Sequence, residues 1–203
     1  MKTELILCFD KDQALGLMEI SGGDAQTFLD LSGQLDKYFI PRYVAEESST
    51  LIHPIPYFAV LNKKGKILLY QRGKGVGESR LLGSHSIGFG GHVELEKDGI
   101  SGELGLRNIE ECITSAYVNE LNEELEFSGS SCNDMLSGMI YDDTNEVGKV
   151  HLGISGSIVV ESATIREEEL LQCGWYSAKD LLNMHKSGEI TLENWSLLLL
   201  EML

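Results

Sequence analysis

The sequence has no long apolar run and no paired cysteines, and each absence excludes a class of protein. No stretch reaches the roughly 18 apolar residues of a membrane-spanning helix, and the N-terminal segment lacks the clean apolar run of a signal peptide. The cysteines show no CxxC pair and no metal-like spacing, so we expect them to be reduced and mostly buried: Cys8, Cys112, Cys132 and Cys173. A cytoplasmic protein is the resulting prediction.

Basic residues are also scarce, with 16 Lys and Arg against 32 Asp and Glu and a formal net charge of −16. Such a surface repels the phosphate backbone of long nucleic acids, so a DNA- or RNA-binding module is not expected. A small phosphorylated substrate remains compatible with this charge, provided that a bound cation and a few local Arg or Lys side chains reverse the potential at the site.

What is present is the composition of a globular domain, with 42% hydrophobic and 24% charged residues in a chain of 203. This length suits one core. We expect residues 1–50 to form an N-terminal extension packed on that core, and residues 51–203 to form the main domain.

Strand-like and helix-like runs alternate along the chain, which indicates an α/β sandwich. The expected strands are residues 5–9, 57–61, 66–71, 86–89, 137–141, 149–160 and 174–176. The expected helices are residues 24–38, 108–126, 178–185 and 194–203. A turn at residues 62–65 joins two of the strands into a hairpin.

The helix expected to end near residue 126 carries the clearest local signals. Asn108 is a plausible N-cap, and Glu111 three residues later completes a capping box. Val118, Leu121 and Leu125 recur at spacings of three and four, so we expect them to form its apolar stripe.

Beside that stripe lie three glutamates, Glu120, Glu123 and Glu124, at positions i, i+3 and i+4. This spacing brings several hard oxygen ligands to one point, as Mg²⁺ or Mn²⁺ prefers. Like charges at this spacing also occur on a solvated helix face, and the three glutamates alone favour that alternative.

The surrounding residues change this balance. The segments GGHVE at 90–94 and NELNEELEF at 119–127, with Glu111 between them, resemble the box of the Nudix hydrolase family. Seven residues separate Glu111 from Asn119, as the family pattern requires, and the later box positions then fall in register. Residues 57–182 also follow the family's order of elements and look like a little-characterised MutT-type subgroup of predicted phosphoesterases.

The resemblance implies a Nudix-type α/β/α sandwich with a mixed sheet, in a family in which homodimers are common. It implies a hydrolase that cleaves a P–O–P bond in a nucleoside-diphosphate-linked or similar small substrate with Mg²⁺ or Mn²⁺. Glu120, Glu123 and Glu124 match the family's metal-binding glutamates. Backbone groups of Gly90 and Gly91 would complete the site, because a loop without Cβ atoms approaches a cation or phosphate closely.

The sequence departs from the box at three points. Asn119 stands where the family has arginine, Glu126 stands where it has glycine, and 19 residues separate Gly91 from Glu111 where the pattern has five. We interpret residues 95–108 as an insertion. Asn119 cannot form the bidentate ion pair of an arginine, although Arg107 or Lys97 from the insertion could compensate.

Other candidate residues flank the glycine-rich segment. Arg72, Lys74 and Arg80 could bind substrate phosphate or simply lie on a solvated hairpin end. His85 and His92 could donate protons or neighbour a metal, but a structural, hydrogen-bonded role is the more common one for a histidine.

Further along the chain the chemistry is less specific. Asp142, Asp143 and Asn145 lie in a turn-like stretch, where turn formation alone explains them and a role in the substrate site is the alternative. His151 lies in an expected strand and could face either side of it. Glu111 could serve as a base or an outer metal ligand, although its capping role accounts for it. We expect Trp175 and Trp195 to pack rather than to stack on a base, and we expect the final LLLLEML to close the core or form a dimer contact.

Two functions therefore remain open. The first is a metal-dependent pyrophosphate hydrolase, and the second, motivated by Asn119 and the insertion, is a Nudix-like domain that only binds a nucleotide or metabolite. A third reading, an unrelated α/β protein with a solvated acidic helix, requires the in-register matches to be accidental.

Overall fold

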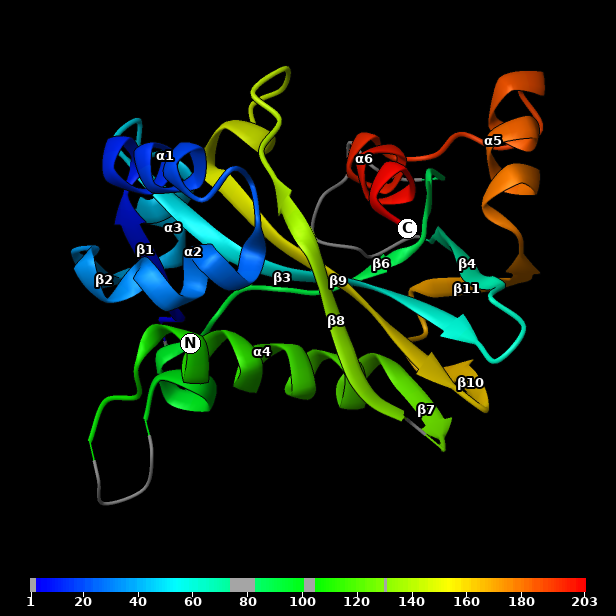
Figure 1. The fold of residues 1–203 in the computed structure, drawn as a ribbon, viewed down its shortest axis with the longest axis horizontal. Coiled ribbons are helices and arrows are strands. Elements are labelled where there is room, and N and C mark those ends of the chain that lie inside the picture. Colours follow the sequence, from blue (N-terminus) through cyan, green and yellow to red (C-terminus); the bar gives the residue numbers. More distant parts are fainter. Residues whose placement is uncertain (1–2, 74–82, 101–104, 130) are drawn as a thin grey trace. The chain divides into compact units, whose positions relative to one another are not determined.

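The computed structural model describes residues 3–73, 83–100, 105–129 and 131–203, with the backbone alone for residues 131–135 (Figure 1). The chain forms two compact units, each built from three segments. The first comprises Met1–Tyr57, Gly90–Glu120 and Leu136–Ser155, and the second comprises Phe58–Phe89, Leu121–Met135 and Gly156–Leu203. Four elements contribute residues to both units: β3 (Leu51–Asn62), α4 (Ile109–Glu124), β8 (Ser131–Ile140) and β9 (His151–Val160).

The first unit is formed largely by the N-terminal 50 residues. Its elements, drawn in the blue to cyan range of Figure 1, are β1 (Leu5–Asp10), α1 (Lys11–Ile20), α2 (Ala25–Leu31), the 3-10 turn η1 (Ser32–Gln34), β2 (Lys37–Pro41) and α3 (Arg42–Glu46). β1 pairs antiparallel with β2 and, through Phe9↔Ile52 and Asp10↔Leu51, with β3. A π-helical turn, η3 (Leu95–Gly99), and a 3-10 turn, η5 (Gly148–Val150), complete it.

The core of this unit joins residues from all three of its segments. Phe9 and Phe28 from the N-terminal segment pack in one buried cluster with Val93, Ile113 and residues of β9. The first 50 residues therefore share a core with α4 and β9, and the domain boundary at residue 50 stays a prediction.

The second unit contains the hairpin and most of the short strands. Its elements are β4 (Ile67–Arg72), β5 (His85–Ser86), β6 (Gly88–Phe89), β7 (Leu125–Ser128), β10 (Ser162–Ile165), β11 (Leu170–Tyr176), α5 (Ala178–Ser187) and α6 (Asn194–Met202). β4 pairs antiparallel with β3, β5 and β11, and β7 pairs antiparallel with β10. Ser177 caps α5 by accepting the backbone N–H of Asp180, and Gly188 ends that helix with a positive φ of 78°.

The start of α4 is the predicted capping box. The backbone N–H of Glu111 donates to Asn108 Oδ1 at 2.8 Å, and the backbone N–H of Asn108 donates to Glu111 Oε2 at 2.9 Å. These two bonds satisfy donors that a helix start otherwise leaves without partners. They explain why α4 begins at Ile109 although Asn108 and Glu111 are both exposed.

Replacing Asn108 with alanine tests this cap. We expect Asn108→Ala to lower the free energy of unfolding by about 0.5–2 kcal/mol, because the N–H of Glu111 loses its side-chain acceptor. Urea unfolding of the full chain measures the change. Thr114→Ala, an exposed position within the same helix, is the control and should shift stability by less; equal losses in both variants would contradict the cap.

Some predictions of secondary structure were wrong. Residues 24–38 are not one helix, because α2 ends at Leu31 and the chain then enters β2, where Tyr38 pairs with Cys8. The helix α1 was not predicted. Val118 does not belong to the apolar stripe of α4, since it is 45% exposed. Leu121 is buried instead together with Tyr117, one turn earlier, and Ile113, two turns earlier.

The other predicted elements are present with shifted ends. α4 ends at Glu124 rather than near residue 126, because Leu125–Ser128 pairs with β10. The expected strand at residues 86–89 is divided between β5 and β6. None of the helices in the described part of the chain has the length and apolar character that a membrane crossing requires.

Candidate functional site

The predicted carboxylate cluster lies in the last two turns of α4. Glu123 is exposed, while Glu120 and Glu124 are half-buried. Residues three and four apart on a helix have Cβ atoms about 5–6 Å from one another, so the three carboxylates can reach a common point. The helix therefore supplies the donor set that the sequence predicts, and the binding of a metal by that set stays a prediction.

Gly91 lies directly against one of these carboxylates. A Cβ at position 91 would lie 2.6 Å from both Cδ and Oε1 of Glu120, and 2.8 Å from its Oε2. Real Cβ atoms do not approach other atoms so closely, so only glycine lets the Glu120 carboxylate occupy this place. The glycine loop and the first of the three glutamates thus meet within the first unit.

Gly90 is required for a different reason. A Cβ there would lie 1.8 Å from the backbone oxygen of Pro56 in β3, and 2.9 Å from its carbonyl carbon. The two glycines therefore have separate roles: Gly90 lets the loop pass close to a strand backbone, and Gly91 lets it contact Glu120.

Asn119, which replaces the box arginine, is held by the segment interpreted as an insertion. Its Nδ2 donates to Oδ1 of Asp98 at 2.8 Å, and Asp98 is only 1% exposed. The other carboxylate oxygen of Asp98 accepts the backbone N–H of Glu94 at 2.8 Å. The buried carboxylate of Asp98 therefore lies beside position 119, where it could also pair with an arginine.

The two cations considered as substitutes for the box arginine are engaged nearby. Arg107 Nη1 donates to the backbone oxygen of Asp98 at 3.1 Å, and Lys97 Nζ lies 3.0 Å from Oε1 of Glu94. Both side chains thus help to fix η3 and the segment after it. The sequence did not indicate Asp98 as a partner, because no motif marks a single aspartate inside an insertion.

Removing the Asn119 amide tests its structural role. We expect Asn119→Ala to lower the free energy of unfolding by about 1–3 kcal/mol, since Asp98 Oδ1 then remains buried without this donor. Val118→Ala, an exposed neighbour on the same helix, should have a smaller effect in the same thermal or urea unfolding experiment. A loss no larger than that of the control would show that Asp98 is satisfied elsewhere.

The predicted phosphate-binding cations are only partly described. Arg72 ends β4, and its Nε donates to Oε1 of Glu193 at 2.5 Å, with side-chain exposures of 20% and 7%. Glu193 therefore fixes the guanidinium within the second unit. Lys74 and Arg80 lie outside the described residues.

Several other candidates have clear structural roles. Asp142 is buried and accepts from the backbone N–H and hydroxyl of Thr144 and from the amide of Asn145, which is the turn chemistry predicted for this stretch. Asp143 is exposed in the same turn. His85 belongs to β5, and its backbone N–H donates to Thr191 at 2.7 Å. Trp175 in β11 and Trp195 in α6 are half-buried.

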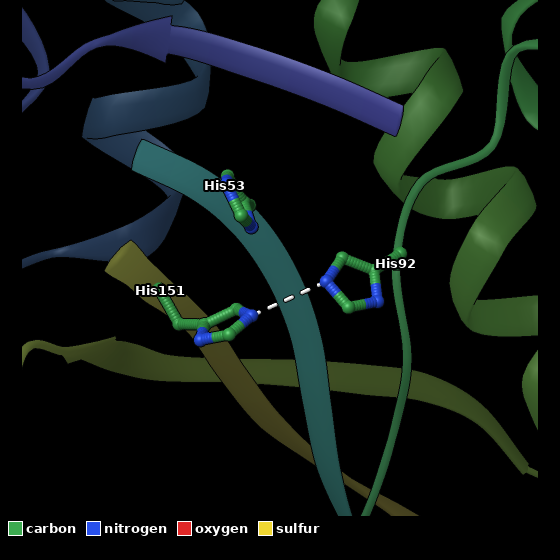
Figure 2. Close-up of side chains that lie close together, drawn as sticks. All are labelled: His53, His92 and His151. Carbon is green, nitrogen blue, oxygen red and sulfur yellow. Dashed lines mark hydrogen bonds between the residues drawn. The ribbon is translucent and has the colours of Figure 1, made fainter. Parts of the chain in front are cut away.

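His92 and His151 lie together with a third histidine that sequence reasoning missed. Figure 2 shows His53 from β3, His92 from the loop after Gly91 and His151 from the start of β9. One nitrogen of each ring lies within 4.8 Å of the others, and the Nε2 atoms of His92 and His151 are 3.2 Å apart. All three residues belong to the first unit.

The environment of two of these rings, His53 and His92, favours their neutral form. Burial lowers the pKa of His53 to about 4, and the neighbouring His151 adds to this effect. Burial also lowers the pKa of His92 well below its usual value, with further contributions from Arg42 and the two other histidines. His92 contacts His151 through its Nε2 atom, and its predicted role in binding substrate stays a prediction.

The cysteines agree with the prediction where they are described. Cys8, Cys112 and Cys173 are free thiols, the first two buried and the third exposed. Burial raises the pKa of Cys8 to about 12 and raises the pKa of Cys112, which makes both unreactive. The side chain of Cys132 lies outside the described part of the chain.

Comparison with known proteins identifies the fold. No family model matches the chain. Protein YmaB of Bacillus subtilis (strain 168) is 33% identical over 165 residues, which cover 78% of this chain and 74% of YmaB. The crystal structure of Tm1382, a candidate Nudix hydrolase, superposes with a TM-score of 0.76 at 23% identity and covers 98% of this chain and 100% of that one. A MutT protein from Methanosarcina mazei Go1 matches less closely, with a TM-score of 0.46, 17% identity and coverage of 74% and 91%. The superposition on Tm1382 confirms the predicted Nudix-type α/β fold.

Proposed function

Because the chain belongs to the family of protein YmaB and has a Nudix-type fold, we propose that it is a metal-dependent hydrolase. Its substrate would be a small molecule that carries a pyrophosphate, such as a nucleoside diphosphate linked to a second group, and water would cleave the P–O–P bond. The observation that carries this proposal is the contact between Gly91 and the Glu120 carboxylate, because it joins the two halves of the box motif.

The residues of α4 suit a divalent cation. Glu120, Glu123 and Glu124 offer carboxylate oxygens, the ligands that Mg²⁺ and Mn²⁺ favour over nitrogen or sulfur. The absence of a Cβ at position 91 leaves room for the Glu120 carboxylate beside the glycine loop. A cation would also relieve the repulsion between neighbouring carboxylates on one helix, which costs a few tenths of a kcal/mol per pair.

Glu120, Glu123 and Glu124 would hold the cation, which would supply positive charge near the pyrophosphate and would lower the pKa of the attacking water. The chain itself positions the carboxylates. The capping box of Asn108 and Glu111 fixes the start of α4, and the bond from Asn119 to Asp98 fixes the helix one residue before Glu120. Glu111 fixes the start of the helix in this scheme, since its Oε2 accepts from Asn108, and its role as a base or an outer metal ligand stays a prediction.

Substrate phosphate would contact the backbone of Gly90 and Gly91. Binding of phosphate by the cationic side chains Arg72, Lys74 and Arg80 is the prediction made from the sequence. For Arg72 this requires the guanidinium to keep a donor beyond those directed at Glu193, and an arginine has five N–H groups to share. The small substrate, the location in the cytoplasm and the homodimer remain predictions.

A second candidate function is that of a domain that binds a nucleotide or metabolite without hydrolysing it. The bond from Asn119 to the buried Asp98 favours it, because position 119 carries no charge with which to hold the neighbouring glutamates in place. The effect of an uncharged residue at position 119 therefore decides between the hydrolase and the binding domain.

A phosphate-release screen distinguishes them. Nucleoside triphosphates, ADP-ribose, NAD, dinucleoside polyphosphates and sugar nucleotides are each incubated with Mg²⁺ or Mn²⁺ and either the wild type or Glu124→Gln. Turnover by the wild type alone would support the hydrolase and identify its substrate class. Saturable metal binding without turnover across the panel would favour the binding domain, with Asn119→Arg as the next variant to assay.

A further inference from the structure

We propose that His53, His92 and His151 form a second metal site, which takes Zn²⁺ or a related transition-metal ion rather than Mg²⁺. The three residues come from positions far apart in the sequence, yet one nitrogen of each lies within 4.8 Å of the other two (Figure 2). None of them belongs to the carboxylate set on α4.

The spacing of the rings suits a tetrahedral ion. Two imidazole nitrogens bound to Zn²⁺ at about 2.0–2.1 Å lie roughly 3.3–3.4 Å from each other in tetrahedral geometry. The Nε2 atoms of His92 and His151 are 3.2 Å apart. The third nitrogen needs only a small movement of its ring, because the largest separation in the group is 4.8 Å.

A backbone contact orients one of the ligands. His151 Nδ1 lies 2.6 Å from the backbone oxygen of Val147, so this nitrogen carries the proton and the Nε2 lone pair faces His92. Metal-binding histidines commonly make such a bond through the nitrogen that does not ligate, since it fixes the tautomer and the ring orientation.

His53 provides the strongest indication of a ligand. It is fully buried at 0% exposure, and neither of its ring nitrogens makes a hydrogen bond of normal distance and angle, although the backbone of Ala45 lies close enough to favour its protonated form. A buried polar group without a partner costs about 1–3 kcal/mol, so proteins rarely retain one without a function. Coordination by His53 would satisfy one nitrogen, and the low pKa values of His53 and His92 leave both rings neutral, as ligands must be.

The nearby charges do not prevent a cation from binding. Arg42 is the positive group that faces His53 and His92, and it is paired with Glu46 at 2.8 Å and with Glu4 at 3.2 Å. Two carboxylates therefore offset the one guanidinium near the site.

The donor set selects the kind of ion. Imidazole nitrogen suits Zn²⁺, Cu²⁺, Ni²⁺ and Co²⁺, whereas Mg²⁺ and Ca²⁺ require oxygen. Three histidine ligands are the number that a catalytic Zn²⁺ ion takes from a protein when water is its fourth ligand. His92 adjoins Gly91, so an ion held here would also fix the loop that contacts Glu120.

The test uses the full chain after chelator treatment. Zn²⁺ binding is measured by equilibrium dialysis in the presence of excess Mg²⁺, and X-ray absorption of the loaded protein counts the imidazole ligands. We expect one tightly bound Zn²⁺ per chain with three imidazoles, and an affinity that falls by about 100-fold or more in His92→Gln and in His151→Gln.

Two controls make the result specific. His185→Gln removes a histidine of α5 and should leave binding unchanged, and so should Glu120→Gln combined with Glu124→Gln, which removes the other proposed site. Circular dichroism confirms that each variant is folded. The proposal would be overturned if the wild type did not bind Zn²⁺ tightly or if its spectrum showed fewer than two imidazoles. It would also be overturned if only the glutamate variant lost Zn²⁺ binding. Each of these results holds whatever the outcome of the hydrolase assay.

Discussion

Replacing Glu120 with glutamine is expected to lower kcat/KM for pyrophosphate hydrolysis by about 100-fold or more at saturating Mg²⁺. Changes in the outer shell of a metal site typically cost 10–100-fold, and Glu120 is proposed as a direct ligand. Glutamine has the same shape, so the contact with Gly91 is preserved and only the charge is lost. Steady-state kinetics on the substrate found in the screen measure the effect.

The fold should not suffer from this change. Removal of one charge relieves repulsion from Glu123 and Glu124, which is worth about 0.2–0.5 kcal/mol per pair, so the unfolding free energy should stay constant or rise slightly. Glu110→Gln is the matched control, because Glu110 is an exposed acid in the first turn of the same helix. Equal activity in both variants would remove Glu120 from the site.

Local features of the fold could be predicted from the sequence where one interaction determines them. The start of α4 is an example, since the residues of the capping box are three positions apart and need no tertiary contact. The hairpin of β3 and β4 is another, because a turn composition separates two β-type runs. Both features depend on interactions between residues that are close together in the sequence, so the sequence alone is enough to predict them.

Where tertiary packing decides, prediction from the sequence failed. Residues 35–38 continue a helix-like pattern, but Tyr38 lies in β2 because pairing with Cys8 of β1 satisfies its backbone. Val118 matched the expected stripe of α4, yet the buried face follows Ile113, Tyr117 and Leu121. Apolar residues spaced three and four apart can be grouped into more than one possible buried face of a helix. The elements that pack against the helix determine which of these faces is buried.

The candidate site shows the same division. The glutamates of α4 could be named from a motif, whereas the partner of Asn119 could not, because Asp98 lies 21 residues earlier in an insertion. The histidine cluster was missed for a similar reason. His53, His92 and His151 have no metal-like spacing, and only the chain fold brings β3, the glycine loop and β9 together.

Alanine substitutions at the two loop glycines should separate stability from activity. Neither Gly90 nor Gly91 has a positive φ, so alanine fits both backbones and only the space around the new Cβ matters. Gly90→Ala would place Cβ 1.8 Å from the backbone oxygen of Pro56, which cannot move without displacing β3. We expect a loss of about 3 kcal/mol or more in unfolding free energy, at the upper end of the usual cost of overpacking.

Gly91→Ala should behave in the opposite way. Its Cβ meets the end of the Glu120 side chain, which can rotate aside without moving backbone, so the unfolding free energy should change by less than about 1 kcal/mol. Catalysis should fall by about 100-fold, because a displacement of about 1 Å at a reacting centre has that effect. Urea unfolding and steady-state kinetics on both variants provide the comparison.

A double variant tests whether Gly91 acts through Glu120. If the glycine matters only because it leaves room for that carboxylate, then Gly91→Ala added to Glu120→Gln should cause little further loss of activity. Independent effects would instead multiply, to a combined loss near 10⁴-fold. Multiplication would place Gly91 in contact with substrate through its own backbone, and full activity of Gly91→Ala with an intact fold would remove Glu120 from the reacting centre.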